Sequence, residues 1–424
     1  MSLALFGGSP TIATPPRRYT SIGPEEVKAA VRVVESGNLS QYVGCWDPDF
    51  YGGPNVRALE SEWASYFKSG NAIAVNSNTS GLMAALGALN LEPGDEVIVS
   101  PWTMSASATA ILVWNAIPVF ADIELETFNL DPASVAARIT PLTRAIVVTD
   151  LFGHPARLSE IMEIARGKGI RVIEDCAQAP GAMYAGKFVG TVADAGVFSL
   201  NYHKHIHTGE GGVVVTDNAE IAERIQLIRN HAESVVADKG VSLLTNMIGF
   251  NFRMTEVEAA IAREQLLKLS GLVKSRMVAA ERLTSALRDL PGLKPPFVRP
   301  GSSHVYYVYA MQYDSSVTGV SRSRLIEALN AEGVDISAGY LNLHLLPMYQ
   351  KRIAYGSAGF PWTGGLYRGT VSYDKGICPQ AERAHESTVL KMEFCKYVYD
   401  DETIDRVAAA FRKVWDHLPS LKDL

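Results

Sequence analysis

Apolar and polar positions change their spacing along the chain in a way that separates strands from helices. Between about residue 55 and residue 230, short β-branched runs alternate with stretches whose apolar residues recur at helical spacing, such as 80–89 and 158–168. The runs that predict strands are 71–75, 96–100, 118–122, 145–150, 171–175, 196–199 and 212–216. This alternation indicates an α/β fold. The near-continuous apolar run at 145–148 predicts a sheet covered on both faces, with ligands at the carboxyl ends of its strands.

The chain after residue 250 follows a different pattern. Thr255-x-x-Glu258 has the form of a capping box, and the apolar spacing after it predicts a long helix, or a helix pair, that extends toward Leu287. Residues 305–312 alternate like a strand, and helical spacing returns at 321–332 and 401–415. We therefore predict two domains joined by the long helix: a large domain at 1–265, which includes an N-terminal arm, and a smaller α+β domain at 266–424.

Composition is that of a compact enzyme. Of the 424 residues, 47% are hydrophobic and 20% are charged, and the mean hydropathy is +0.05; a disordered chain would be more polar. The net charge of -6 argues against nucleic-acid binding, because neutralising phosphates needs a concentrated basic surface. An anionic ligand therefore requires a local positive site.

The sequence predicts a cytoplasmic, soluble protein. Its four cysteines are too widely spaced for CxxC pairs or for a zinc or iron–sulfur site, which fits a reducing compartment. The first residues lack a charged leader. The most apolar stretch, 97–120, is interrupted by Pro101 and several polar residues, so it predicts buried strand and helix and not a membrane span.

The first segment with candidate chemistry is Asn76-Ser-Asn-Thr79-Ser80-Gly81, which lies between an apolar strand and an apolar helix. Backbone N–H groups and hydroxyls at such a helix start can bind a phosphate. The segment is not a Walker loop, because no Gly-Lys-Ser/Thr follows it. Taken alone, it would be interpreted first as an ordinary Ser/Thr N-cap.

A second segment, Val172-Ile-Glu-Asp175-Cys-Ala-Gln178, ends an apolar strand with an acidic pair. A carboxylate at a strand end can keep a cofactor's ring nitrogen protonated, as the electron sink of pyridoxal phosphate requires. The alternative is an Asp that caps the next helix.

The third segment contains Lys204, which lies between a strand and the turn Gly209-Glu-Gly-Gly212. A lysine among neutral or titratable neighbours can lose its proton and become a nucleophile. An isolated lysine would be a solvated surface residue. The three segments together carry more weight than any one of them.

In this order the segments resemble the DegT/StrS-type sugar aminotransferases, which are fold-type I pyridoxal-phosphate (PLP) enzymes related to aspartate aminotransferase. The matching features are a Thr at a helix start, Asp-x-x-Gln, a Ser five residues before a Lys, and Gly-Glu-Gly-Gly. Further matching stretches are 94–99, 118–122, 249–256 and 340–344, so the resemblance covers nearly the whole chain. It implies a mainly parallel seven-stranded sheet with helices on both faces and a smaller C-terminal α+β domain.

The resemblance also implies roles for individual residues. Lys204 would bind PLP as a Schiff base and shuttle a proton, and Asp175 would pair with the pyridine nitrogen. Gln178 would contact the ring hydroxyl side. The residues implied for the phosphate are Thr79, Ser80 and Ser199, together with Asn251, which would reach the cofactor of a neighbouring subunit. A homodimer with shared sites follows.

One position departs from the family pattern. Where the family places an aromatic ring over the cofactor, this chain has Met104, with Trp102 two residues earlier. A thioether can pack on an aromatic ring, so stacking need not be lost. Met104 is therefore predicted to bind the cofactor, and Trp102 is either a second candidate or part of the core.

Three rival functions are considered. His203, His205 and His207 alternate and would share a strand face as metal ligands, but Lys204 lies among them and no carboxylate pairing is evident, so no metal is expected. Dehydratase relatives replace the lysine by histidine, and Lys204 argues against that activity. A catalytically silent PLP-binding protein would not need Lys204, Asp175 and Gln178 together.

We therefore predict a ping-pong aminotransferase with L-glutamate or L-glutamine as amino donor. The predicted acceptor is a nucleotide-linked ketosugar of amino-sugar biosynthesis, and the alternative is a keto-cyclitol such as scyllo-inosose. A nucleotide-linked acceptor requires a basic patch, to which Arg253 could contribute. The candidate lid is 40–53. The candidate acceptor contacts are Trp46, Trp102, Tyr202, His203, His231 and His344.

Overall fold

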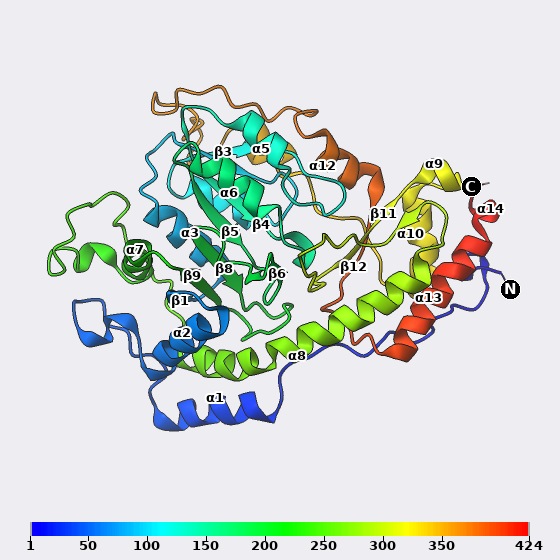
Figure 1. Cartoon of the computed structure of the whole chain (residues 1–424), viewed down its shortest axis with the longest axis horizontal. Coiled ribbons are helices and arrows are strands. Elements are labelled where there is room, and N and C mark those ends of the chain that lie inside the picture. Colours follow the sequence, from blue (N-terminus) through cyan, green and yellow to red (C-terminus); the bar gives the residue numbers. More distant parts are fainter. Residues whose placement is uncertain (1, 423–424) are drawn as a thin grey trace.

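A seven-stranded sheet forms the centre of the computed structural model, which describes residues 2–422 (Figure 1). The strand order is β1-β9-β8-β5-β4-β2-β3. The strands are β1 (Asn71–Val75), β2 (Glu96–Val99), β3 (Ile117–Phe120), β4 (Thr143–Thr149), β5 (Arg171–Asp175), β8 (Ala195–Ser199) and β9 (Gly212–Thr216). Only β9 runs against its neighbours in this sheet, and the five strands from β8 to β3 are parallel. The predicted mainly parallel seven-stranded sheet is confirmed.

Each predicted strand is present, and the differences lie at the ends. The prediction carried the third strand to Asp122, but β3 ends at Phe120. The Asp122 carboxylate instead accepts hydrogen bonds from the backbone N–H groups of Gln380 and Ala381, both at 2.9 Å. The Asp122 backbone N–H donates to Ser134 Oγ at 2.7 Å and its carbonyl accepts from the Asp131 N–H at 3.0 Å, so neither group continues the ladder with β2.

Helices cover both faces of the sheet, because alternate strand residues point to opposite sides. One face packs against α3 (Asn78–Ala88), α4 (Ala106–Leu112) and α7 (Ala219–Arg229). The other face packs against α2 (Pro54–Phe67) and the first part of α8 (Glu256–Leu287), and, further along, against α5 (Pro132–Arg138) and α6 (Leu158–Arg166). Within residues 2–422, no helix has both the length and the apolar composition needed to cross a membrane.

Helix α8 is continuous over 32 residues and passes from one core to another (Figure 1). It begins at the predicted capping box: Thr255 Oγ1 accepts from the Glu258 backbone N–H, and the Glu258 carboxylate accepts from the Thr255 N–H. Its residues up to Val273 belong to the core beside α2, and those from Ala279 onward belong to a second core. The predicted division between residues 265 and 266 falls inside this helix.

The second core lies around a three-stranded antiparallel sheet of β10 (Leu293–Lys294), β11 (Tyr309–Tyr313) and β12 (Val389–Met392). Helices α10 (Arg322–Ala331) and α13 (Asp401–Asp416) pack against it. The strand predicted at 305–312 begins only at Tyr309. Its first residues instead bond to the segment that follows β4, where the Val305 and Val308 N–H groups donate to the Gly153 and Phe152 carbonyls.

The N-terminal arm packs on this second core, which is formed by residues far from the arm in the sequence. Leu3 and Ile12 are buried there. The buried Glu332 carboxylate accepts from the backbone N–H groups of Ala4 at 2.8 Å and Thr11 at 2.9 Å, and forms an ion pair with Lys413 at 2.9 Å. The arm is therefore held by residues more than 300 positions later.

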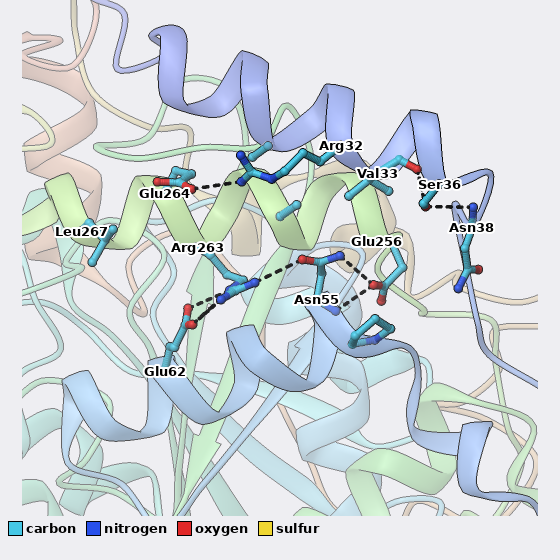
Figure 2. A pocket seen from close by; sticks show the side chains of 13 residues that line it. Arg32, Val33, Ser36, Asn38, Asn55, Glu62, Glu256, Arg263, Glu264 and Leu267 are labelled. Atoms are coloured by element: carbon cyan, nitrogen blue, oxygen red, sulfur yellow. Dashed lines mark hydrogen bonds and ion pairs between the residues drawn. The ribbon is translucent and has the colours of Figure 1, made fainter.

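The remaining helices are short or peripheral. Helix α1 (Pro24–Ser36) lies along α8, and Figure 2 shows the cleft of about 420 Å³ between α1, α2 and α8. The charged side chains that line this cleft are engaged locally: Arg263 pairs with Glu62 at 2.7 Å, and the Glu256 carboxylate accepts from Asn55. The other elements are α9 (Ser315–Thr318), α11 (Pro347–Lys351), α12 (Pro379–Arg383), α14 (Leu418–Leu421) and the hairpin of β6 (Met183–Tyr184) and β7 (Lys187–Phe188).

Candidate active site

A cavity of about 190 Å³ opens at the carboxyl ends of the parallel strands, where ligands of open α/β sheets bind. The segments after β1, β2, β5 and β8 contribute to its wall, and two tyrosines come from the C-terminal part of the chain. The lining residues are Ser77, Asn78, Thr79, Thr103, Met104, Ala106, Asp175, Ala177, Gln178, Ser199, Asn201, His203, Lys204, Glu210, Gly211, Tyr307 and Tyr340. Thr79, Met104, Asp175, Gln178, Ser199, His203 and Lys204 were predicted from the sequence, and the fold brings them together.

Asp175 is the last residue of β5 and is buried. Its carboxylate accepts from Ser107 Oγ at 2.8 Å and from the Ala177 backbone N–H at 3.2 Å, with a longer contact to Asn78 Nδ2 at 3.4 Å. Burial raises the pKa of Asp175 above its ordinary value, while the hydrogen bonds and the charge of Lys204 oppose that shift. The result is a fixed carboxylate with an oriented set of donors, suited to a protonated ring nitrogen.

Lys204 lies in the same cavity and is also buried. Burial lowers the pKa of its amine to about 8, although the nearby charges of Asp175, Cys395 and Glu393 favour the charged form. Its Nζ lies 4.3 Å from the centroid of the Tyr307 ring. A pKa near 8 leaves an appreciable neutral fraction at neutral pH, and only the neutral amine is a nucleophile.

Gln178 links the cavity floor to the C-terminal part of the chain. Its Oε1 accepts from the Phe152 backbone N–H at 2.8 Å, and its Nε2 donates to Tyr340 Oη at 3.0 Å. These two bonds fix the orientation of the side-chain amide. The amide therefore holds Tyr340 against the cavity.

The start of α3 supplies an anion-binding geometry. Ser77 is the N-cap, and its Oγ accepts from the Ser80 N–H at 3.0 Å, so the helix begins two residues before the predicted Ser80. A Cβ on Gly212 would lie 2.6 Å from the Ser77 carbonyl carbon, so glycine allows β9 to approach this turn closely. Thr79 and Ser199 line the cavity beside the helix start, where backbone N–H groups and the helix dipole stabilise a phosphate.

Ser80 does not line the cavity. Its side chain is buried, and its Oγ donates to Asn76 Oδ1 at 2.6 Å. The hydroxyl is therefore committed to the turn itself.

Met104 and Trp102 take different places. Met104 lines the cavity with 55% of its surface exposed. Trp102 is fully buried against Phe128 and Phe152, and its indole N–H donates to the Tyr340 carbonyl at 2.6 Å. Trp102 therefore belongs to the core. It does not line the cavity, which was the other possibility considered for it from the sequence.

Of the six candidate acceptor contacts, only His203 lines the cavity. Its pKa is lowered to about 4 by burial and by the charge of Lys204, so it is neutral at physiological pH. The Tyr202 ring contacts the His203 ring edge-on, with centroids 4.9 Å apart, and is otherwise exposed. His344 is fully buried, and its Nε2 lies 3.0 Å from the Glu382 carboxylate, which makes it a structural histidine.

The two remaining contacts, Trp46 and His231, lie on loops outside the lining of this cavity. Trp46 packs edge-on against Tyr51, and Lys239 lies over its ring at 4.4 Å. His231 is partly exposed near Glu233. Neither residue lines the cavity. Asn251 is also outside the lining of its own chain's cavity: it is exposed, and its Oδ1 accepts from Arg253 Nε at 2.7 Å.

Sequence reasoning missed four residues that complete the site. Ser107 and Asn78 hold Asp175, Tyr307 lies against Lys204, and Tyr340 bonds to Gln178. Asn78 and Tyr340 had a signal, because each belongs to a stretch that resembles the family. No local spacing marks Ser107 or Tyr307, since each acts through a contact that crosses between elements.

The site and the fold together define a PLP-dependent enzyme of fold type I. The donor set fits the cofactor: a buried carboxylate for the ring nitrogen, an amine of depressed pKa opposite it, and hydroxyls with N–H groups at a helix start for the phosphate. The chain belongs to the DegT/DnrJ/EryC1/StrS aminotransferase family, whose model matches residues 45–391. It is thus a PLP-dependent aminotransferase.

Both sequence relatives and solved structures are similar to this chain. The spore coat polysaccharide biosynthesis protein SpsC of Bacillus subtilis is 36% identical over 358 residues, which cover 83% of this chain and 89% of SpsC. The L-glutamine:scyllo-inosose aminotransferase of Streptomyces griseus is 33% identical over 98% of both chains. Among solved structures, DesI in the presence of its TDP-sugar product matches with a TM-score of 0.81 and 28% identity, over 99% of this chain and 98% of DesI.

Proposed function

We propose that this chain transfers an amino group from L-glutamine or L-glutamate to the ketone of a polyhydroxylated ring. The observation that carries the proposal is the placement of Asp175 and Lys204 in one cavity, one as an oriented carboxylate and the other as an amine of lowered pKa. When bound, PLP supplies the electron sink for a carbanion at the substrate carbon.

The residues of this chain have distinct proposed tasks. Asp175 holds a proton on the ring nitrogen, and Lys204 holds the cofactor and moves a proton at the substrate carbon through its Nζ. Gln178 orients the ring hydroxyl side, and Met104 covers the ring by thioether packing. Thr79, Ser199 and the N–H groups at the start of α3 bind the phosphate. His203, neutral at physiological pH, both donates and accepts hydrogen bonds toward the acceptor.

For the acceptor, two observations favour a free keto-cyclitol. The scyllo-inosose enzyme of Streptomyces griseus matches this chain from end to end. Among the described lining residues, Lys204 is the one cation, so this chain's own wall offers no further positive charge to a pyrophosphate. Arg253, the expected contributor, bonds to Asn251 outside the lining.

The nucleotide-linked ketosugar expected from the sequence is the second candidate. It is favoured by the similarity to DesI, which was solved with a TDP-sugar. A partner subunit could supply the required cations, because we also propose that the protein is a homodimer in which Asn251 reaches the partner's site. The two acceptor classes differ most in charge, so an assay separates them.

The test of the reaction is Lys204→Ala. We expect this variant to lose the visible absorption of the lysine-bound cofactor and to have no measurable turnover, whereas Lys187→Ala, at an exposed lysine, keeps both. An unchanged spectrum and rate in Lys204→Ala would disprove the assignment. A silent PLP-binding protein would show the spectrum but no amino transfer from either donor.

The test of the acceptor is a panel of ketones supplied with L-glutamine and analysed by mass spectrometry for the amino product. The panel contains scyllo-inosose and UDP-, dTDP- and GDP-linked ketosugars. We expect amination of the free cyclitol. Product from a nucleotide-linked ketosugar alone would reject the cyclitol and support the second candidate.

A further inference from the structure

Three buried acidic or thiol groups lie directly behind Asp175. Asp150 follows β4, and Glu174 and Cys176 flank Asp175 in the chain; none of the three has exposed surface. Their carboxylate and thiol atoms all lie within 4.8 Å of one another. Because side chains alternate along a strand, Glu174 points to the side of the sheet opposite the Asp175 cavity. The proposed reaction uses none of these groups.

The two carboxyl groups are short of partners. Asp150 Oδ1 accepts from the Ala156 backbone N–H at 2.9 Å, but Oδ2 has no hydrogen-bond partner among the described residues. Neither carboxylate oxygen of Glu174 has a hydrogen-bond partner among the described residues. Two buried carboxylates in contact cannot both stay ionised without compensation, so either a proton or a metal ion must lie between them.

The surroundings favour a proton, and they place it on Asp150. Backbone N–H groups of Gly190, Val192 and Ala193 face the Glu174 carboxylate and lower its pKa against the larger effect of burial. N–H dipoles pointed inward stabilise an anion and repel a cation. Burial and the Glu174 charge both raise the pKa of Asp150 well above its usual range.

The Cys176 thiol is protonated as well. Burial and the charges of Glu174 and Asp175 raise its pKa well above the usual value. A protonated thiol is a poor metal ligand, because the thiolate is the form that binds. The cluster therefore carries one negative charge, on Glu174, and one carboxyl proton.

This cluster is tied to the catalytic carboxylate. The Asp150 backbone N–H donates to the Asp175 carbonyl at 3.1 Å, and Glu174 directly precedes Asp175. We propose that Asp150 keeps its proton, donates it to the Glu174 carboxylate, and through this bond between the ends of β4 and β5 positions Asp175. Asp150 and Glu174 are thus positioning residues. Their effect on the reaction rests on the proposed role of Asp175.

Two substitutions at Asp150 test the donor. In Asp150→Asn, the side-chain amide keeps a donor for Glu174 and an acceptor for Ala156, so we expect cofactor affinity within about twofold of the parent. Asp150→Ala leaves the Glu174 charge unpaired, and we expect about tenfold weaker cofactor binding and a shifted pH dependence of the bound cofactor's absorption. Equal loss in both variants would overturn the proposal.

Glu174→Gln tests which partner carries the charge. Its amide would turn N–H donors toward the N–H groups of Gly190, Val192 and Ala193. We therefore expect cofactor affinity to fall about tenfold or more, in contrast to Asp150→Asn. If Glu174→Gln is the tolerated variant and Asp150→Asn is not, the proton lies on Glu174 and the proposal is wrong as stated.

The proton itself is measured on the cofactor-free protein, independently of any activity. The infrared band of a protonated carboxyl group should be present in the parent and absent from Asp150→Asn in the difference spectrum. Elemental analysis of the purified protein should show no stoichiometric metal; one metal ion per chain, lost in Cys176→Ala, would overturn the assignment. Failure of the proposed aminotransferase reaction would leave both measurements unaffected.

Discussion

At the scale of single residues, burial sets the chemistry of Lys204. Among residues 2–422, no cation is a cause of its lowered pKa, and the charges around the amine favour the protonated form. Its pKa nevertheless falls to about 8, because removing an ammonium group from water costs more than those charges return. A nucleophile can therefore be prepared by enclosure alone.

This predicts the pH dependence of the cofactor-free protein. An amine-reactive reagent should label Lys204 at a rate that rises with pH around a midpoint of about 8, whereas the lysine of a short model peptide reacts around roughly 10.4. Peptide mass spectrometry of pulse-labelled protein, with the model peptide added to the same reaction, measures both rates together. A midpoint for Lys204 equal to that of the model peptide would contradict the effect of burial.

Ser107 is predicted to act through Asp175. Ser107→Ala removes the 2.8 Å hydrogen bond that lowers the pKa of Asp175, so the carboxylate becomes easier to protonate and loses orientation. We expect kcat/KM to fall about tenfold, since a lost hydrogen bond to a buried charge costs roughly 1.5–3 kcal/mol. Ser105→Ala is the matched control, because Ser105 makes no side-chain cap at the start of α4.

The sequence predicts the parts of the site that local order can encode. Asp175, Gln178, Ser199 and Lys204 lie at strand ends whose spacing can be seen in the chain. Ser107 reaches Asp175 across 68 positions, and Tyr340 reaches Gln178 across 162. Such contacts depend on how elements pack, so no spacing rule finds them.

At the scale of elements, the positions of the seven main strands and the mainly parallel sheet were predicted, whereas the antiparallel direction of β9 was not. Direction depends on the connection: β8 and β9 are joined by the short segment that carries Lys204, with no crossover helix, and they pair antiparallel. Residues 305–308 alternate like a strand, but the backbone N–H groups of Val305 and Val308 donate to Gly153 and Phe152 and not to a neighbouring strand. Alternation alone therefore does not show where a strand begins.

The capping box of α8 is a testable element. Glu258→Gln should leave stability nearly unchanged, because glutamine completes the same box, whereas Glu258→Ala should lower the unfolding free energy by about 1 kcal/mol. Urea unfolding followed by far-UV circular dichroism compares the pair. Equal stability of the two variants would show that the box contributes nothing here.

At the scale of the whole molecule, a shared active site makes a quantitative prediction. If Asn251 serves the partner's site, chains carrying Lys204→Ala and chains carrying Asn251→Ala complement each other when co-expressed. Half of the randomly formed dimers are mixed, and each has one intact site, so about one quarter of the parental activity should return. Lys204→Ala with Ser199→Ala is the control, because both residues line the same chain's cavity and no intact site forms. Activity no greater than the sum of the two variants expressed separately would place every cofactor ligand in one chain.

The anchoring of the N-terminal arm has a consequence for how the chain is made. Residues 3–12 leave the ribosome well before Glu332 and Lys413, which hold them, are synthesised. At roughly 10 residues per second, about half a minute separates the synthesis of residue 12 from that of Glu332. On stalled nascent chains, trypsin should cut after Arg17 when synthesis stops near residue 320 but much more slowly once residues up to 422 have left the ribosome, since the Arg17 carbonyl then accepts from the Val398 N–H. Cleavage after Arg17 therefore reports whether the later segment has docked on the N-terminal arm.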